Sequence, residues 1–153
     1  MIGDRGGRYE RIYEQLREVI GGDSPSLCAA MSTVCAVLHA KMPHHLWTGF
    51  YLVAGDELHV GPYQGPLACQ VLRGGGVCLR AVATRAAVVV PDVRSFPGHV
   101  ACDARARSEI AIPVLKGDRA VAVLDVDSRE PRQFTATDVA PLERILALLA
   151  PYL

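Results

Sequence analysis

The sequence predicts an α+β domain in which an antiparallel sheet lies between helices from the two ends of the chain. Two patterns support this prediction. Apolar residues recur at helical spacing over about the first forty positions and again at the C-terminus, whereas residues 46–62 and 108–127 contain short apolar runs joined by tight turns. Helices around antiparallel hairpins define the α+β class. The 153 residues contain no repeat and no linker, which predicts one domain over 1–153.

The N-terminal part of the chain predicts two helices. Over 8–20 the apolar side chains share one helical face, and the glycine pair at 21–22 ends the run. We expect the second helix to run to about Ala40, with Ser24 as its N-cap and Pro25 at its first helical position.

From Leu46 onward the periodicity changes to that of strands, interrupted by one short helix. The expected elements are, in order, a strand over 47–53, its hairpin partner over 57–62, a loop over 63–76, a short helix from about Val77, a strand over 86–90, a long loop over 91–107 and a second hairpin of 108–115 with 119–127. A loop as long as 91–107 in a small domain is usually functional. The C-terminal helix is expected to be capped by Thr137 or Asp138.

Charge and composition argue against several classes of function. Sixteen Lys and Arg residues balance sixteen Asp and Glu residues, so nothing favours nucleic acid or an anionic membrane as a partner. The first twenty residues lack the apolar core of a secretion signal. The longest apolar runs are far shorter than the roughly 20 residues that span a bilayer. The sequence therefore predicts a cytoplasmic protein.

The five cysteines fall into two groups. An odd number in a chain without an export signal argues against a fixed disulfide framework. Cys28 and Cys35 are seven residues apart on the second predicted helix, and we interpret both as packed core thiols. Cys69, Cys78 and Cys102 lie in loops or at the ends of elements, where they are either catalytic or structural.

Two of the loop cysteines have surroundings that favour the reactive thiolate. Cys78 follows three glycines and should lie in the first turn of a helix, where the dipole and free N–H groups stabilise a negative charge. Cys102 is followed by Arg105 and Arg107, whose positive charges would lower its pKa.

A metal site is a weaker interpretation of the same region. Cys69, Cys78, His99 and Cys102 include the ligand types of a structural zinc site, but their spacing contains no Cys-x-x-Cys pair. The glycine triplet at 74–76 matches no phosphate-binding fingerprint. We therefore expect neither a metal nor an organic cofactor.

Acidic and aromatic side chains could form a pocket on the predicted sheet. Asp125 and Asp127 are two apart on one strand and so point to the same face, and Glu109 on the neighbouring strand could join them. Crowded carboxylates repel, so one could keep its proton at neutral pH and act as a general acid; the alternative is a solvated strand end. Trp47 and Tyr51 share a face of the first strand, either as core residues or as the wall of a small apolar pocket.

Several motifs together resemble one known family, in that family's order, from about Trp47 to Glu143. They are Trp-Thr-Gly-Phe-Tyr at 47–51, Gly-Pro-Tyr-Gln-Gly at 61–65, Ala-Cys at 68–69, Gly-Val-Cys at 76–78, Asp-Val at 92–93, Phe-Pro-Gly-His-Val-Ala-Cys-Asp at 96–103, Ser-Glu-Ile at 108–110 and Leu-Asp-Val-Asp-Ser at 124–128. This set is similar to the free methionine-R-sulfoxide reductases, which have a GAF fold.

The resemblance implies a role for each candidate residue. Cys102 would be the thiolate that attacks the sulfoxide, and Cys69 and Cys78 would be resolving cysteines, in an order that stays open. The implied substrate is free methionine-R-sulfoxide, the implied reductant is thioredoxin, and a homodimer is expected by analogy of fold. Glu109, Asp125 and Asp127 match the family's acidic pocket. Trp47 and Tyr51 match its aromatic wall.

Two non-catalytic functions use the same residues. One is a GAF sensory module that binds a small ligand; such modules usually accompany output domains, for which we expect no room in 153 residues. The other is a redox switch with a disulfide between Cys102 and either Cys69 or Cys78. The chain also departs from the family's pattern, because 70–76 is one residue shorter than usual and Leu79 replaces a common glycine.

Overall fold

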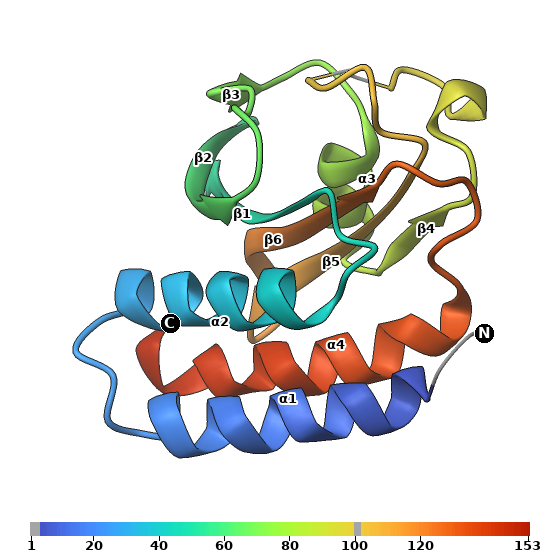
Figure 1. Cartoon of the computed structure of the whole chain (residues 1–153). Helices are drawn as coiled ribbons and strands as arrows, with labels where there is room; N and C mark the ends of the chain where they lie inside the picture. The colour runs from blue at the N-terminus through green and yellow to red at the C-terminus, as the bar shows by residue number, and fades with distance from the viewer. Residues whose placement is uncertain (1–3, 100–101) are drawn as a thin grey trace.

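The computed structural model describes residues 4–99 and 102–153, which form a three-layer α+β fold (Figure 1). Its sheet has the strand order β3-β2-β1-β6-β5-β4, and every pair of neighbours is antiparallel. The strands are β1 (Trp47–Ala54), β2 (Glu57–Gln64), β3 (Val71–Leu72), β4 (Val88–Val90), β5 (Ser108–Lys116) and β6 (Arg119–Ser128). The helices are α1 (Arg5–Ile20), α2 (Leu27–Lys41), α3 (Val77–Thr84) and α4 (Val139–Leu146), with short 3-10 turns at Val93–Ser95, Ala136–Asp138 and Ala147–Tyr152. The predicted fold class is confirmed.

The two faces of the sheet carry two separate apolar cores. Helices α1, α2 and α4 cover one face, and α3 lies on the other (Figure 1). Because side chains alternate along a strand, Phe50 points into the helical core while its neighbour Tyr51 belongs to the core under α3. The same alternation on β6 sends Leu124 to the helices and Val123 to the α3 side. The candidate acidic and aromatic residues therefore lie on the α3 face.

Helix α2 begins two residues later than predicted. Its N-cap is Ser26, whose hydroxyl accepts a hydrogen bond from the amide of Ala29 at 3.1 Å. The predicted cap, Ser24, instead donates its hydroxyl to the Ser26 carbonyl, so Pro25 precedes the helix rather than opening it. Two serines flank the proline, and the hydroxyl of the second one meets an amide of the first helical turn.

The C-terminal helical region is also capped by a different residue. Thr135 caps the turn Ala136–Asp138, and the Asp138 carboxylate accepts the Thr135 amide at 2.8 Å in return. Asp138 directly precedes α4 but makes no side-chain cap there. Its buried carboxylate accepts hydrogen bonds from Tyr9 at 2.9 Å and Arg5 at 3.2 Å. Asp138 therefore joins the first helix to the last, a tertiary role that local sequence does not reveal.

Within the region predicted as a loop, the structure contains the additional strand β3. Its two residues, Val71 and Leu72, pair with His59 and Leu58 of β2. A pair this short leaves no periodicity to detect. In the described part of the chain, no helix combines the length and the apolar character needed to cross a membrane.

Candidate active site

A pocket opens on the α3 side of the sheet and is lined by most of the site residues that the sequence predicts, with Cys69 bonded to the lining residue Cys102. Its empty space, including the open mouth, is about 590 Å³. The lining residues come from β1, β5, β6, the start of α3 and the two loops that carry Cys69 and Cys102. They are Trp47, Tyr51, Leu67, Ala68, Leu72, Gly75, Gly76, Val77, Cys78, His99, Cys102, Asp103, Ala106, Glu109, Asp125 and Asp127.

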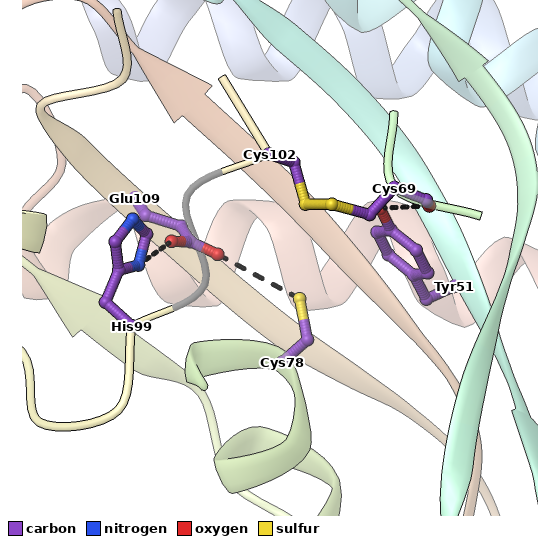
Figure 2. Close-up of a disulfide and its surroundings, with 6 residues drawn as sticks. All are labelled: Tyr51, Cys69, Cys78, His99, Cys102 and Glu109. Atoms are coloured by element: carbon purple, nitrogen blue, oxygen red, sulfur yellow. Dashed lines mark hydrogen bonds and ion pairs between the residues drawn. A yellow bond between two sulfur atoms is a disulfide. The ribbon is translucent and has the colours of Figure 1, made fainter. Parts of the chain in front are cut away.

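Two of the three loop cysteines are joined by a disulfide at the pocket (Figure 2). Cys69 lies between β2 and β3, and Cys102 lies in the loop before β5; their Cα atoms are 5.5 Å apart, a usual separation for a disulfide. Cys78 remains a free thiol. The two residues before Cys102 in the motif, Val100 and Ala101, lie outside the described residues.

The other two cysteines lie on α2, away from the pocket. Cys35 is buried in the helical core, as predicted, and its thiol donates to the carbonyl of Pro62 at 3.3 Å. The expectation that Cys28 is a packed core thiol is wrong, since its side chain is exposed. Cys28 lies in the first turn of α2, where the chain enters the helix from the surface.

Cys78 occupies the first turn of α3, as predicted, but its surroundings oppose ionisation. Gly76 caps the helix with φ 110°, a conformation that favours glycine. Burial raises the pKa of the Cys78 thiol well above its usual range, and the charges of Asp125 and Glu109 raise it further. Its sulfur lies 3.9 Å from Glu109 Oε1, an S–H donor contact to the carboxyl (Figure 2). The expected thiolate at this helix end is therefore absent: Cys78 is a neutral thiol.

The three carboxyl groups converge as the strand alternation predicts. Glu109 on β5 is the direct cross-strand partner of Asp127 on β6, and Asp125 is two residues earlier on the same face. Burial raises the pKa of Glu109 well above its usual range, and the charges of Asp125 and Asp127 raise it further. Burial also raises the pKa of Asp125 and, more strongly, that of Asp127. The alternative of a solvated strand end does not hold, because Glu109 and Asp125 are buried.

These raised pKa values favour protonated carboxyl groups in the pocket at neutral pH. Carboxylates that are both desolvated and crowded lower their energy by keeping protons. Burial and the neighbouring charges favour the protonated form of Glu109, while Asp125 Oδ1 is buried without a hydrogen-bond partner among the described residues. An unpaired buried acceptor beside a cavity is a binding position for a ligand's donor group.

Arg105, proposed to lower the pKa of Cys102, is engaged elsewhere. Its guanidinium forms a two-pronged ion pair with Asp103 at 2.7 and 3.0 Å. This pairing lowers the pKa of Asp103 to about 2. The backbone of Arg107 bonds to Val93 and Ser128, which fixes the end of the Cys102 loop against β6. The positive charge near Cys102 is thus offset by a neighbouring carboxylate.

Two aromatic rings, Trp47 and Tyr51, line the site, and a third ring, that of Tyr63, stacks on Trp47 without lining the pocket. Trp47 stacks between Tyr51 and Tyr63, with ring centroids 5.7 and 5.3 Å away. The indole Nε1 is buried without a hydrogen-bond partner among the described residues. The Tyr51 hydroxyl donates to the carbonyl of Cys69 at 3.0 Å (Figure 2). Sequence reasoning missed Tyr63, although it belongs to the quoted motif at 61–65.

His99 is a second site residue that sequence reasoning did not select, except as a zinc ligand. Its Nδ1 lies 3.8 Å from Glu109 Oε2, and burial lowers the pKa of the imidazole (Figure 2). In the described part of the chain, the ligand atoms that converge within 4.8 Å belong to Cys78, Glu109 and Asp125, which differs from the proposed zinc set.

Fold and pocket together define a GAF domain with a thiol and carboxyl site on its α3 face. The GAF domain family model matches residues 10–153. GAF domain-containing protein A of Dictyostelium discoideum is 38% identical over 149 residues, covering 96% of this chain and 93% of the relative. The free methionine-R-sulfoxide reductase of Escherichia coli is 36% identical over 147 residues, covering 91% of this chain and 88% of the relative.

A solved structure supports the same assignment. The X-ray structure of free methionine-R-sulfoxide reductase from Neisseria meningitidis in complex with its substrate superposes with a TM-score of 0.93 at 37% identity, covering 99% of this chain and 92% of the other. The chain belongs to the free methionine-R-sulfoxide reductases, a family of oxidoreductases within the GAF fold. The family and the enzyme class predicted from the motifs are confirmed.

Proposed function

We propose that this chain reduces free methionine-R-sulfoxide to methionine through a relay of Cys102, Cys69 and Cys78. The observation that carries the proposal is the position of the Cys69–Cys102 disulfide: Cys102 lines the same pocket as Glu109, Asp125 and Asp127, whose pKa values are raised by burial. Sulfoxide reduction needs these two components together: a thiol to take the oxygen and an acid to protonate it.

In the first step, the Cys102 thiolate attacks the sulfoxide sulfur while Glu109 donates its proton to the sulfoxide oxygen. Two electrons pass from the cysteine sulfur to the substrate, so methionine leaves and Cys102 becomes a sulfenic acid. Cys102 suits this role better than Cys78 because it is exposed, whereas Cys78 is buried and its pKa is raised.

In the second step, the Cys69 thiol attacks the sulfenic sulfur. The S–O bond breaks, the S–S bond forms and water leaves with the thiol proton. The net reaction converts two thiols and a sulfoxide into a disulfide, a thioether and water. Cys78 then serves as a second resolving thiol, and we propose thioredoxin as the external dithiol that restores the enzyme by exchange.

The acidic pocket explains why the substrate is a free amino acid. A free amino acid carries an α-ammonium group, and the unpaired Asp125 Oδ1 with Asp127 offers it acceptors. A peptide-bound sulfoxide has a neutral amide at that position, which offers one N–H donor and no positive charge in place of the three donors of the ammonium, at a cost in affinity. Trp47 and Tyr51 supply the apolar wall for the side chain of the substrate.

The wider assignments of cell location and assembly are part of the same proposal. We propose that residues 1–153 act as one GAF domain in the cytoplasm, where a dithiol reductant is available, and that the protein forms a homodimer. Neither proposal is needed for the chemistry of the pocket.

The test is turnover of racemic free methionine sulfoxide with thioredoxin, thioredoxin reductase and NADPH, followed by chiral analysis of the residual sulfoxide. N-acetylmethionine sulfoxide and the variants Cys102→Ser and Cys28→Ser run in parallel, since Cys28 is a cysteine outside the pocket. We expect only the free R form to disappear, with Cys102→Ser inactive and Cys28→Ser unchanged. A folded, reduced wild-type protein that consumes no sulfoxide would refute the proposal and leave a ligand-binding module or a redox switch.

A further inference from the structure

The segment that carries Cys69 makes few backbone hydrogen bonds to the rest of the molecule, although the side chains of Ala68 and Cys69 pack against the core under α3. It follows the last residue of β2 and ends at Gln70, whose carbonyl accepts the Val60 amide at 3.0 Å. Between these two anchors, Leu67 is 87% exposed and Gly65 has φ 118°. Among hydrogen bonds between the described residues, the one that reaches the backbone of 65–69 comes from the Tyr51 hydroxyl to the Cys69 carbonyl.

Tyr51, in contrast, is held rigidly. It lies near the middle of β1 and pairs with Val60 on β2 and with Val123 on β6. Its ring is 2% exposed and stacks on Trp47. Because two neighbouring strands fix Tyr51, its hydroxyl lies at one point relative to the sheet. The hydrogen bond therefore fixes the Cys69 carbonyl relative to the sheet.

We infer that the Tyr51 hydroxyl is a positioning group of the relay: it holds Cys69 within reach of Cys102 and thereby sets the rate of disulfide formation. This inference rests on the proposed relay and gives Tyr51 a role beyond the aromatic wall. Once the disulfide is reduced, the covalent bond to Cys102 no longer restrains Cys69. The hydrogen bond to Tyr51 then limits how far the thiol can move, which raises its effective concentration at the sulfenic acid.

The size of the effect follows from the kind of contact. A neutral hydrogen bond at 3.0 Å is worth about twofold to tenfold in a rate or an equilibrium. The Tyr51→Phe variant keeps the ring, its stacking and the wall of the pocket, and loses the donor alone. It should therefore slow the step that follows sulfoxide reduction.

The experiment is a single-turnover reaction of reduced Tyr51→Phe with methionine sulfoxide. Methionine release reports the first step, and trapping of the Cys102 sulfenic acid by dimedone reports its lifetime. We expect a sulfenic acid that lives about twofold to tenfold longer than in wild type, measured against the methionine released in the same reaction. Tyr63→Phe is the matched control, because this tyrosine stacks on the other side of Trp47 and its hydroxyl has no hydrogen bond to the described residues.

Two further measurements separate positioning from damage to the fold. The Cys69–Cys102 couple of Tyr51→Phe, equilibrated against a dithiothreitol buffer, should become about twofold to tenfold easier to reduce, equivalent to about 9 to 30 mV. Replacement of Tyr51 by 4-aminophenylalanine restores an N–H donor and should restore the wild-type lifetime.

The outcomes distinguish this inference from the proposed function. If wild type releases no methionine, the proposed function itself fails. If wild type is active and a folded Tyr51→Phe variant forms the disulfide as fast as wild type, the positioning role is overturned while the enzyme assignment stands. If Tyr51→Phe does not fold, the 4-aminophenylalanine variant decides: a sulfenic acid lifetime that stays lengthened despite the restored donor also overturns it.

Discussion

Reduction of the Cys69–Cys102 disulfide should destabilise the folded protein by an amount that its position in the chain determines. The two cysteines are 33 residues apart. In the chain-entropy description, closing a loop of that length removes freedom from the unfolded chain worth about 3.7 kcal/mol at 25 °C. In a chain of this length each kcal/mol shifts Tm by about 2–4 °C, so the oxidised form should melt about 7–15 °C above the reduced form.

The assay is differential scanning calorimetry at pH 7 on two preparations of the same protein. One is oxidised with an equivalent of methionine sulfoxide, and the other is reduced with a phosphine. Cys78→Ser should keep the difference in Tm, because Cys78 is the free thiol, whereas Cys69→Ser should abolish it. Equal Tm values for the two wild-type forms would refute the loop-entropy reasoning. A difference that vanishes in Cys78→Ser and survives in Cys69→Ser would refute the assignment of the disulfide.

Three further perturbations test the site and the core. Glu109→Gln should lower turnover about 100-fold or more by removing the general acid. The same substitution should raise the free energy of unfolding above pH 5, because a raised pKa means that the contribution of Glu109 to stability is lost as pH rises through that pKa. A urea titration that shows no gain in the free energy of unfolding at pH 8 contradicts this expectation. Burial holds the pKa of His45 well below 6.5, so the free energy of unfolding should fall as pH drops below about 6.5. This loss should be shallower in His45→Gln and unchanged in His59→Gln, since His59 is exposed. Urea midpoints from pH 7.5 to 4.5 measure the loss. Gly49→Ala places a methyl group against the Trp47 ring, so KM should rise severalfold, and an unchanged KM would show that the ring does not border the substrate.

The sequence was sufficient to predict which face of the sheet carries the chemistry. A period of two residues places Asp125 and Asp127 on one side of a strand whatever the details of packing. The hairpin then requires a neighbour such as Glu109 to lie beside them, and the structure pairs it with Asp127. The two long hairpins and the terminal helices were equally accessible, because their apolar patterns extend over many residues.

Features that depend on a few atoms, or on contacts between distant segments, were beyond reach. Choosing Ser26 over Ser24 as the cap depends on which hydroxyl meets a free amide. The raised pKa of Cys78 follows first from burial and then from the charges of Asp125 and Glu109, which lie about thirty residues or more further along the chain. The pairing of Cys69 with Cys102 could not be derived from spacing, because the two loops approach each other only through the assembled sheet.

The division of the site between strands and loops has an evolutionary consequence. The carboxyl groups lie on β5 and β6, two paired strands near the middle of the sheet, whereas Cys69 and Cys102 lie on connecting segments. Insertions, deletions and substitutions accumulate more readily in connections than in strands. A lineage could therefore retune the speed of thiol exchange or the choice of reductant while substrate selectivity is inherited unchanged.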